Sequence, residues 1–339
     1  MRNTYSLVSL LVLIILASCT PKVKFSKPYT VAFYNVENLF DTIDTPNKID
    51  EEFLPTAPKE WNTEKYTKKI HDLAHVLSAI DTINLPVLVG VAEIENDKVL
   101  NDLVADAQLQ KAHYKVVWND GPDVRGIDCA LLYNPTVFSL INYEPLPVKD
   151  LSDPDFITRD VLYVEGKMRE EVFHIFVNHW PSRLGGEEAS EPKRMLAASV
   201  VRKKVDAIFA VDSMANIIIM GDMNDEPGDM SLQDVLMATP NTSMPDAKQL
   251  VNLMYDDYEK GLGSYSYRGD WDQIDNIVVS GALITKKGGL KSKLDNGFIF
   301  HKPFMEFKNN QGEISPNRTY GRTYYGGISD HFPVYMILN

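Results

Sequence analysis

The chain has 339 residues, of which 44% are hydrophobic, so it is long enough for one large domain or two small ones with a substantial core. Its formal net charge of −13 argues against a protein that coats nucleic acid through a broad basic surface, because such binding depends on Lys and Arg. The same charge is compatible with an enzyme that meets phosphate through a bound metal ion.

The first residues have the pattern of an export signal. Arg2 is followed by a short apolar run over residues 7–16, and a run of this length suits the core of a signal peptide better than a membrane span. The sequence Leu-Ala-Ser-Cys that ends at Cys19 resembles a bacterial lipobox, in which the cysteine is acylated and becomes the first residue. We therefore predict a lipoprotein signal peptide over residues 1–18 and a tether over residues 19–28. A plain signal peptide with an incidental cysteine is the alternative.

Cysteine use is compatible with a lipid anchor. The chain has two cysteines, and if Cys19 carries lipid then Cys129 has no disulfide partner, so stability has to come from core burial. Cys129 lies in an apolar run and is predicted to be a small buried hydrophobic residue. Thr20 follows Cys19, and by resemblance to lipoprotein sorting rules this predicts an exported protein, lipid-anchored in the outer membrane of a Gram-negative bacterium.

After the tether, predicted strands and helices alternate along the chain. The predicted strands are short, rich in β-branched or aromatic residues, and bounded by polar or Gly/Pro positions. They cover residues 30–34, 87–91, 114–118, 129–133, 161–165, 172–177, 217–220, 274–279 and 332–338. The segment 217–220 is apolar throughout, which predicts a strand buried on both faces.

Two helices and one long loop complete the pattern. Apolar residues at helical spacing predict a helix over Thr63–Ile80, and a second helix is predicted over residues 191–209, beginning near Pro192. The acidic, proline-containing segment 41–62 is predicted to be a loop, and loops of this length are often functional. Because no change in composition marks a boundary, we predict one α/β domain over residues 29–339.

Polar residues stand at the ends of several predicted strands, where they are expected to converge on one edge of the sheet, the place where α/β proteins bind ligands. Asn35 and Glu37 are two positions apart, so on an extended strand end their side chains point the same way. Glu93 follows the next strand, and Glu95 is expected to be exposed. Amide and carboxylate oxygens are hard ligands suited to Mg²⁺ or Mn²⁺, although each motif alone is also typical of a turn or a solvent-exposed acid.

Further polar pairs follow later strands. Asn178 and His179 close one strand with Arg183 nearby. Imidazole exchanges a proton near neutral pH and Arg binds phosphate, although a lone His is more often structural. Asp222 and Asn224 close the fully apolar strand, where a carboxylate has to find a metal, a proton or a hydrogen-bond donor.

The last polar segments complete a pattern that resembles one protein family. Asp330 and His331 begin the final strand, and Asp275 precedes another buried strand, from which it is expected to orient an imidazole. Taken in order, these segments resemble the endonuclease/exonuclease/phosphatase family, which is related to DNase I. Gly-Asp-x-Asn followed by Ser-Asp-His carries most of the resemblance, which covers nearly all of the chain after the tether.

The resemblance implies a fold and a metal. The implied fold is α/β, a four-layer α/β sandwich of two stacked mixed β-sheets flanked by helices, as in DNase I. The implied cofactor is Mg²⁺ or Mn²⁺, with Ca²⁺ as a third candidate, held by Asn35 and Glu93 with Asp330 near it. Glu37 is a further candidate metal ligand, although the family often has the shorter Asp at this position.

The resemblance also implies roles in catalysis and phosphate binding. The candidate catalytic residues are His179, Asp222, Asp275 and His331. The candidate phosphate-binding residues are Asn178, Asn224 and Arg125. Asp222 would position or deprotonate the attacking water, and His331, oriented by Asp275, would stabilise or protonate the charged transition state. His179 matches an extra histidine of the DNase I-like branch, and a surface loop residue is the alternative for Arg125.

These roles predict a metal-dependent phosphodiesterase or endonuclease that acts on nucleic acid. We expect a monomer that touches a membrane only through its N-terminal lipid. A hydrolase of a phospholipid headgroup, or of an inositol or sugar phosphate, is the alternative within the same fold, because the site motifs are shared. A non-catalytic binding lipoprotein is the second alternative, and the presence of the whole polar set argues against it.

The lipid anchor is tested by replacing its attachment residue. Cys19→Ala leaves no thiol to be acylated after the signal peptide, so we expect the protein to move from the membrane fraction to the soluble fraction. Immunoblotting of fractionated cells measures this, and Cys129→Ala is the control that keeps its membrane location. A Cys19→Ala protein that remains in the membrane fraction contradicts the lipobox interpretation.

Overall fold

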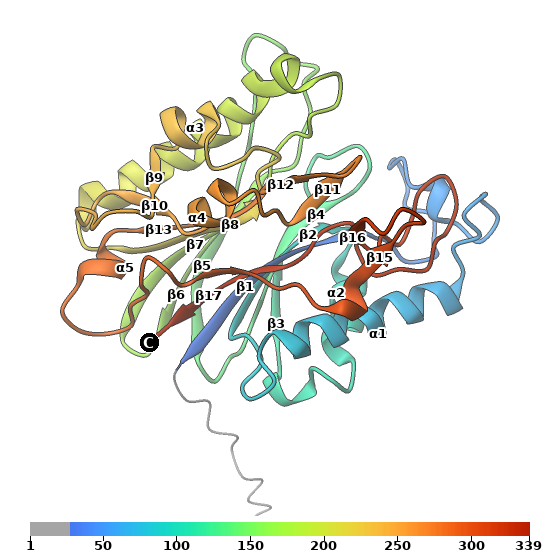
Figure 1. Cartoon of the computed structure of the whole chain (residues 1–339), viewed down its shortest axis with the longest axis horizontal. Coiled ribbons are helices and arrows are strands. Elements are labelled where there is room, and N and C mark those ends of the chain that lie inside the picture. The colour runs from blue at the N-terminus through green and yellow to red at the C-terminus, as the bar shows by residue number, and fades with distance from the viewer. Residues whose placement is uncertain (1–27) are drawn as a thin grey trace, which may run out of the picture.

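Two large β-sheets pack face to face in the computed structural model, which describes residues 28–339 (Figure 1). The predicted signal peptide, Cys19 and all of the predicted tether except Pro28 lie outside the described residues. The first sheet has the order β14 (Gly297–Ile299), β17 (Val334–Leu338), β1 (Tyr29–Leu39), β2 (Leu88–Ile94), β4 (Asp128–Tyr133) and β3 (Lys115–Trp118). The second has the order β5 (Phe138–Leu146), β6 (Val161–Met168), β7 (Glu171–His179), β8 (Asn216–Asp222), β13 (Asp275–Ser280), β10 (Leu250–Asn252) and β9 (Ala238–Pro240).

Helices cover the outer faces of the two sheets (Figure 1). The long helices are α1 (Thr63–Ile80) and α2 (Asp97–Ala105) on the first sheet and α3 (Glu187–Val211) on the second. The short helices are α4 (Tyr255–Glu259) and α5 (Ala282–Thr285), with single helical turns at Glu51–Phe53, Gln110–Ala112, Ser231–Val235 and Pro303–Met305. Two hairpins stand apart from the large sheets, β11 (Tyr265–Tyr267) with β12 (Asp270–Asp272), and β15 (Glu306–Lys308) with β16 (Ile314–Pro316).

This architecture confirms the predicted α/β sandwich of two stacked mixed sheets flanked by helices. The pairs β1–β2 and β7–β8 are parallel, whereas β1–β17 and β8–β13 are antiparallel, so both sheets are mixed. Within the described part of the chain, no helix has both the length and the apolar character that crossing a membrane requires.

Side-chain hydrogen bonds fix where the long helices begin. The Asn62 side chain accepts a hydrogen bond of 3.1 Å from the backbone N–H of Lys65, which caps the start of α1. Helix α3 begins at Glu187, four residues before the predicted start. The side chains of Ser190 and Arg194 both donate to the carbonyl of Glu187, so side-chain hydrogen bonds add to the backbone bonds that stabilise this additional first turn.

The central strand β8 is buried on both faces, as its apolar sequence predicts. Ile218 and Met220 pack between the two sheets, and Ile217 and Ile219 pack beneath α3. Cys129 is a free, buried cysteine between the sheets, which confirms the prediction for this residue.

Irregular backbone shapes the sheet edge that carries the polar residues. The pairing of β1 with β2 shifts register between Asn35 and Leu39. Glu37, Asn38 and Glu93 have φ values of 49°, 50° and 66°, in the left-handed region that non-glycine residues seldom occupy. A local irregularity of this kind breaks the strand period of two and redirects the side chains that follow.

Two parts of the sequence prediction need correction. Glu95 is buried rather than exposed, because its carboxylate accepts hydrogen bonds from the backbone N–H of Asp41 (2.6 Å) and the hydroxyl of Thr45 (2.8 Å), which ties the long loop to the end of β2. The strand β5, the helix α2 and the two hairpins were not predicted. The middle of β5 is exposed, and the other elements are too short to show a clear apolar period.

Gly221 tests how closely β8 packs against β7. A Cβ atom at Gly221 would lie 2.4 Å from the backbone carbonyl oxygen of Asn178, which cannot move aside. We expect Gly221→Ala to lower the free energy of unfolding by about 1–3 kcal/mol, measured by urea denaturation. Gly288→Ala is the control, since no atom lies within 4 Å of a Cβ there, and it should cost less than about 0.5 kcal/mol. Equal unfolding free energies for the two variants would contradict this account of the packing.

Candidate active site

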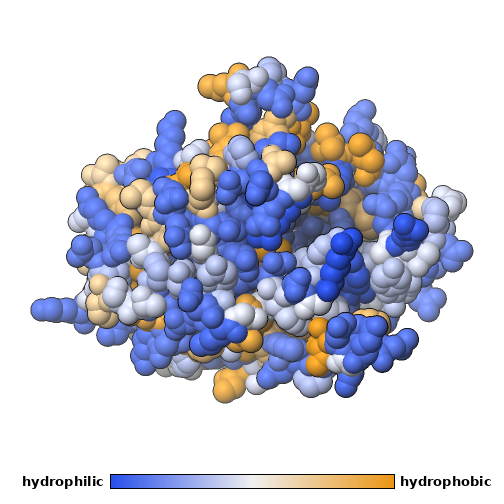
Figure 2. Space-filling model, turned by 45° about the horizontal axis from the view of Figure 1, so that its top comes forward, coloured by the Kyte–Doolittle hydropathy of each residue, from blue (hydrophilic) through white to orange (hydrophobic). Residues whose placement is uncertain are grey.

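A cleft of about 490 Å³ opens where the polar strand ends of the two sheets meet. The face shown in Figure 2 is hollowed near its middle and is mainly hydrophilic. The cleft is lined by Glu93, Arg125, His179, Ser182, Arg183, Glu187, Asp222, Asn224, Tyr265, Tyr267, Asp272, Ile274, Asp330 and His331. The strand ends that the sequence marked as candidates therefore do converge in space.

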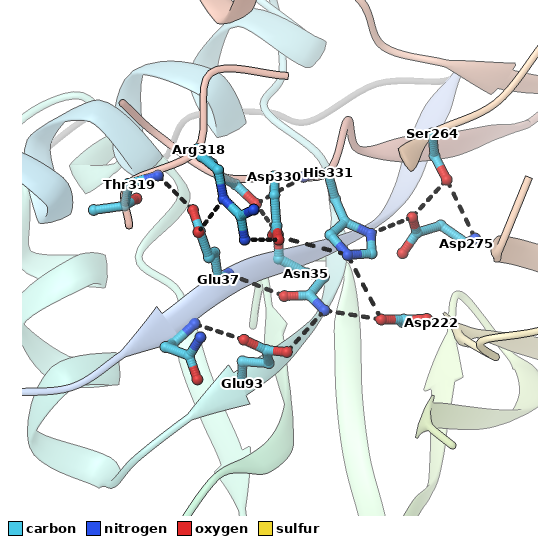
Figure 3. A network of polar contacts seen from close by, with 12 residues as sticks. Asn35, Glu37, Glu93, Asp222, Ser264, Asp275, Arg318, Thr319, Asp330 and His331 are labelled. Carbon is cyan, nitrogen blue, oxygen red and sulfur yellow. Dashed lines mark hydrogen bonds and ion pairs between the residues drawn. The ribbon is translucent and has the colours of Figure 1, made fainter. Parts of the chain in front are cut away.

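The centre of the cleft is a buried pair of His331 and Asp275 (Figure 3). Nδ1 of His331 lies 2.7 Å from Oδ2 of Asp275, and Nε2 faces Oδ2 of Asp222 at 3.8 Å. Burial acts to lower the pKa of His331, but the charge and hydrogen bond of Asp275 raise that pKa well above its ordinary value. The histidine is therefore held as a cation with one N–H available to the cleft.

Asp222 is a buried carboxylate at the end of β8. Its Oδ1 accepts a 3.0 Å hydrogen bond from the backbone N–H of Asn224, and its Oδ2 accepts one of 2.9 Å from the side chain of Asn35. Burial raises the pKa of Asp222 to about 7, while the charge of His331 acts in the opposite direction. Such a group is suited to accept a proton near neutral pH.

The side chain of Asn35 donates hydrogen bonds to two carboxylates of the site. The backbone N–H of Glu37 donates to Oδ1 of Asn35 at 2.9 Å, and because an N–H can only donate, this contact fixes which amide atom is the oxygen. The amide nitrogen therefore faces the cleft, where it donates to Asp222 and, at 3.3 Å, to Glu93. The assignment of Asn35 as a metal ligand stays a prediction, which would use the second lone pair of the Oδ1 that accepts from Glu37.

Glu93 and His179 form the wall opposite His331. Oε2 of Glu93 accepts a 2.7 Å hydrogen bond from the backbone of Asn38, which leaves Oε1 beside the Asn35 amide. Nε2 of His179 lies 3.8 Å from Glu93 and 3.6 Å from Asp222. Burial, with the nearby charge of Arg159, lowers the pKa of His179 well below its ordinary value, so this imidazole is neutral.

Glu37 points away from the cleft centre (Figure 3). Its buried carboxylate accepts hydrogen bonds from the backbone of Thr319 and Tyr320 and pairs with Arg318 at 3.4 Å. The positive φ at Glu37 explains the difference from the sequence prediction, because it breaks the strand alternation that would point the side chains of Asn35 and Glu37 the same way. Glu37 therefore anchors the C-terminal segment, and the prediction that it is a metal ligand is wrong for this geometry.

The two asparagines predicted to bind phosphate differ in position. Asn178 is completely buried; its amide donates to the carbonyl of Met220 at 3.1 Å and accepts from the indole of Trp180 at 3.0 Å. It therefore cannot reach a substrate, and that prediction is corrected: the residue joins β7 to β8. Asn224 lines the cleft and donates to the carbonyl of Trp180 at 3.0 Å.

Arg125 reaches the cleft from a loop that a buried ion pair holds in place. Its guanidinium is about half exposed and lies 3.7 Å from Asp123. Asp123 is held in turn by Arg159 at 2.9 Å, and Arg159 also donates to the backbone carbonyl of His179. This arrangement keeps Arg125 available to an anion in the cleft.

Three residues that support the site carry no recognisable motif in the sequence. Ser264 donates to Asp275 at 2.5 Å and so fixes the carboxylate behind His331. Arg318 bridges Glu37 and Asp330, with a distance of 2.9 Å to Asp330. Lys69 of α1 is buried and donates to the hydroxyl of Thr319 at 2.6 Å. Lys69 and Arg318 are far in sequence from Thr319 and Glu37, and all three residues lie outside any recognised motif, so only the fold shows their contacts.

The donor set fits a hard divalent cation. Glu93, Asp222 and Asp330 present carboxylate oxygens to one cleft, and oxygen ligands of this kind suit Mg²⁺, Mn²⁺ or Ca²⁺. Possible ligand atoms of Asp222, Asp275 and His331 also lie within 4.8 Å of one another. Because Nδ1 of His331 is already hydrogen-bonded to Asp275, that pair suits proton transfer better than metal binding.

Solved structures share the fold of this chain. A humanized TDP2 from D. rerio is 15% identical, with a TM-score of 0.55, and the match covers 93% of this chain and 100% of that chain. The catalytic domain of human nocturnin is 15% identical, with a TM-score of 0.54, covering 92% and 94%. A mannosyl-6-phosphatase from Bacteroides thetaiotaomicron is 16% identical, with a TM-score of 0.56, covering 92% and 99%. The chain is thus an α/β protein of the DNase I-like fold class, as predicted.

The family follows from the sequence match. Residues 30–339 match the model of the Endonuclease/Exonuclease/phosphatase family, and the chain belongs to this family, which confirms the resemblance. The family consists of phosphoester hydrolases that generally depend on a divalent metal. No curated protein matches the chain.

Two substitutions of His331 distinguish a catalytic role of this residue from a structural one. His331→Gln keeps a donor toward Asp275 but cannot carry a proton, so we expect turnover to fall by about 10²–10³ with a melting temperature close to that of the native protein. His331→Ala should also lose stability, because it leaves a buried carboxylate without its cation. His71→Ala, an exposed histidine of α1, is the control for both measurements. A His331→Gln protein with native turnover would remove this residue from the chemistry.

Proposed function

We propose that the protein is a divalent-metal-dependent phosphodiesterase that cleaves nucleic acid with Mg²⁺ or Mn²⁺. The observation that carries the proposal is the buried cationic His331–Asp275 pair beside Asp222, in a cleft that Glu93 also lines. Cleavage of a phosphodiester needs an acceptor for the proton of water and cationic donors for the charge that develops on phosphate. Both line this cleft, where His331 lies beside Asp222.

The residues of the chain divide the work. Glu93 and Asp330 would hold the cation, which when bound supplies Lewis-acid polarisation of the phosphate. Asp222 orients the attacking water and takes its proton, since burial raises the pKa of this carboxyl to about 7. The one free N–H of His331, at Nε2, donates a hydrogen bond to a phosphate oxygen or delivers its proton to the leaving oxygen, while Arg125 binds a further oxygen.

A hydrolase of a sugar or inositol phosphate, or of a phospholipid headgroup, is the second candidate. The net charge of −13 favours a small substrate over a long polyanion. One structural neighbour is a mannosyl-6-phosphatase, at an identity that supports the fold alone. A purely binding role is disfavoured because the proton acceptor, the histidine pair and the acidic ligands are all present in one cleft. We propose that the enzyme acts as a monomer, exported and anchored by lipid on Cys19.

Metal dependence rests on Glu93. We expect Glu93→Gln to bind Mg²⁺ or Mn²⁺ at least about tenfold more weakly, because an amide lacks the charge of the carboxylate. Calorimetric titration of the metal measures this, alongside the melting temperature. Glu170→Gln, an exposed acid in the turn between β6 and β7, is the control. Equal metal affinity for native protein and Glu93→Gln would remove Glu93 from the ion's ligands.

The substrate is tested by comparing phosphate esters at one metal concentration. We expect metal-dependent, chelator-sensitive cleavage of single-stranded and double-stranded oligonucleotides to exceed hydrolysis of sugar phosphates, inositol phosphates and phospholipids in kcat/KM. The His331→Gln protein in the same series excludes contaminating nuclease. Faster release of phosphate from a sugar phosphate would favour the second candidate, and no turnover of any ester would contradict the proposed function.

A further inference from the structure

A second hollow of about 1040 Å³ adjoins the catalytic cleft. The two share Tyr265, Tyr267 and Asp330 as lining residues, so they lie side by side. The second hollow lies between the β11–β12 hairpin and the segments 306–307 and 315–327. We call it the aromatic groove; its other lining residues are Ser266, Arg268, Glu306, Phe307, Ser315, Pro316, Asn317, Arg318, Tyr324, Tyr325, Gly326 and Gly327.

Aromatic rings stand exposed along this groove. Tyr267 is 54% exposed, Phe307 57% and Tyr325 60%. Single exposed apolar residues are ordinary on a protein surface, but these three come from three separate segments and line one hollow. Their grouping beside the catalytic cleft provides flat surfaces for a planar ligand group.

Cationic side chains accompany the rings. The Arg268 guanidinium stacks over the Tyr267 ring at 5.0 Å and makes no ion pair with any residue in the described part of the chain. Arg318 lies at the junction with the catalytic cleft, where it pairs with Asp330. An aromatic surface alternating with arginine is the arrangement that binds a phosphate backbone together with stacked bases.

Hydrogen bonds hold the far wall of the groove in place. The backbone N–H groups of Tyr325 and Gly326 both donate to the carbonyl of Thr319, at 2.8 and 3.3 Å. The side chain of Lys68 on α1 donates to the carbonyl of Gly326 at 3.0 Å. A wall fixed in this way lowers the ordering cost of binding.

We propose that the aromatic groove binds the unpaired bases of a short single strand next to the scissile phosphate, so that the enzyme selects single-stranded over duplex nucleic acid. This inference rests on the proposed phosphodiesterase function and specifies its substrate. Ring faces in a groove can stack only on bases that are free of a partner strand. The acidic chain lacks the broad positive field that holds a duplex, so local stacking has to supply the affinity.

Binding without turnover tests the groove. A short fluorescent single strand, its duplex and a base-free strand of equal length are titrated into the full-length protein in the presence of a chelator, with anisotropy as the readout. We expect the single strand to bind at least about tenfold more tightly than the base-free strand, which is in the range for loss of base stacking. It should also bind more tightly than the duplex.

Ring variants locate the effect. Tyr325→Ala and Phe307→Ala should each weaken binding of the single strand by about tenfold and leave the base-free strand unaffected, since neither residue lines the catalytic cleft. Tyr325→Phe, which keeps the ring, should bind as the native protein does. Tyr143→Ala is the matched control, an exposed tyrosine of β5 outside both hollows. Equal binding of strands with and without bases, or tightest binding of the duplex, would overturn the proposal.

Cleavage of the base-free strand with metal present is measured in parallel. This strand contains the scissile ester but nothing to stack, so it reports the phosphodiesterase function without the groove. Turnover of it at a kcat near that of the natural strand, with a higher KM, supports both proposals together. Turnover of the base-free strand with the same KM as the natural strand would contradict the groove proposal alone. Absence of turnover on both strands would contradict the proposed function.

Discussion

Compensation of buried negative charge organises the functional edge of this molecule. Asp222, Asp275 and Glu37 are buried, and a buried carboxylate needs a donor, a cation or a proton to be stable. The His331 cation lies beside Asp222 and Asp275, and the cations of Lys69 and Arg318 lie near Glu37. Since these cations come from α1 and the C-terminal segment, charge compensation joins the first and last parts of the described chain to the strand ends of both sheets.

Backbone N–H groups give this charged centre its fixed directions. The N–H of Glu37 decides which atom of Asn35 faces the carboxylates, the N–H of Asn224 holds Asp222, and that of Asn38 holds Glu93. A backbone donor can neither rotate nor accept, so the carboxylates are oriented before substrate arrives. Such preorganisation is what stabilises developing charge in a transition state at little reorganisation cost.

The sequence indicated the strand ends well and the direction of individual side chains less well. Asp275 and His331 are far apart in the chain, yet the resemblance of the motifs to one family predicted that Asp275 orients His331, and the two side chains lie 2.7 Å apart. Asn178 and Glu37 were misassigned for physical reasons. Asn178 is enclosed by the packing of β7 on β8, and the left-handed backbone at Glu37 breaks the strand alternation on which the prediction relied.

By itself, the sequence indicated alternating strands and helices and a buried central strand, because apolar periodicity is a local property of a linear chain. The order of the polar motifs along the chain indicated the family, and the resemblance to that family implied the sandwich. Only the tertiary structure decided that Arg318 and Lys69 support the site, that Asn35 turns its amide nitrogen to the carboxylates, and that aromatic side chains from three segments share a groove. These contacts join residues distant in sequence through bulges and loops, and neither the position of a loop nor the direction of a side chain after a bulge is encoded by a repeating period.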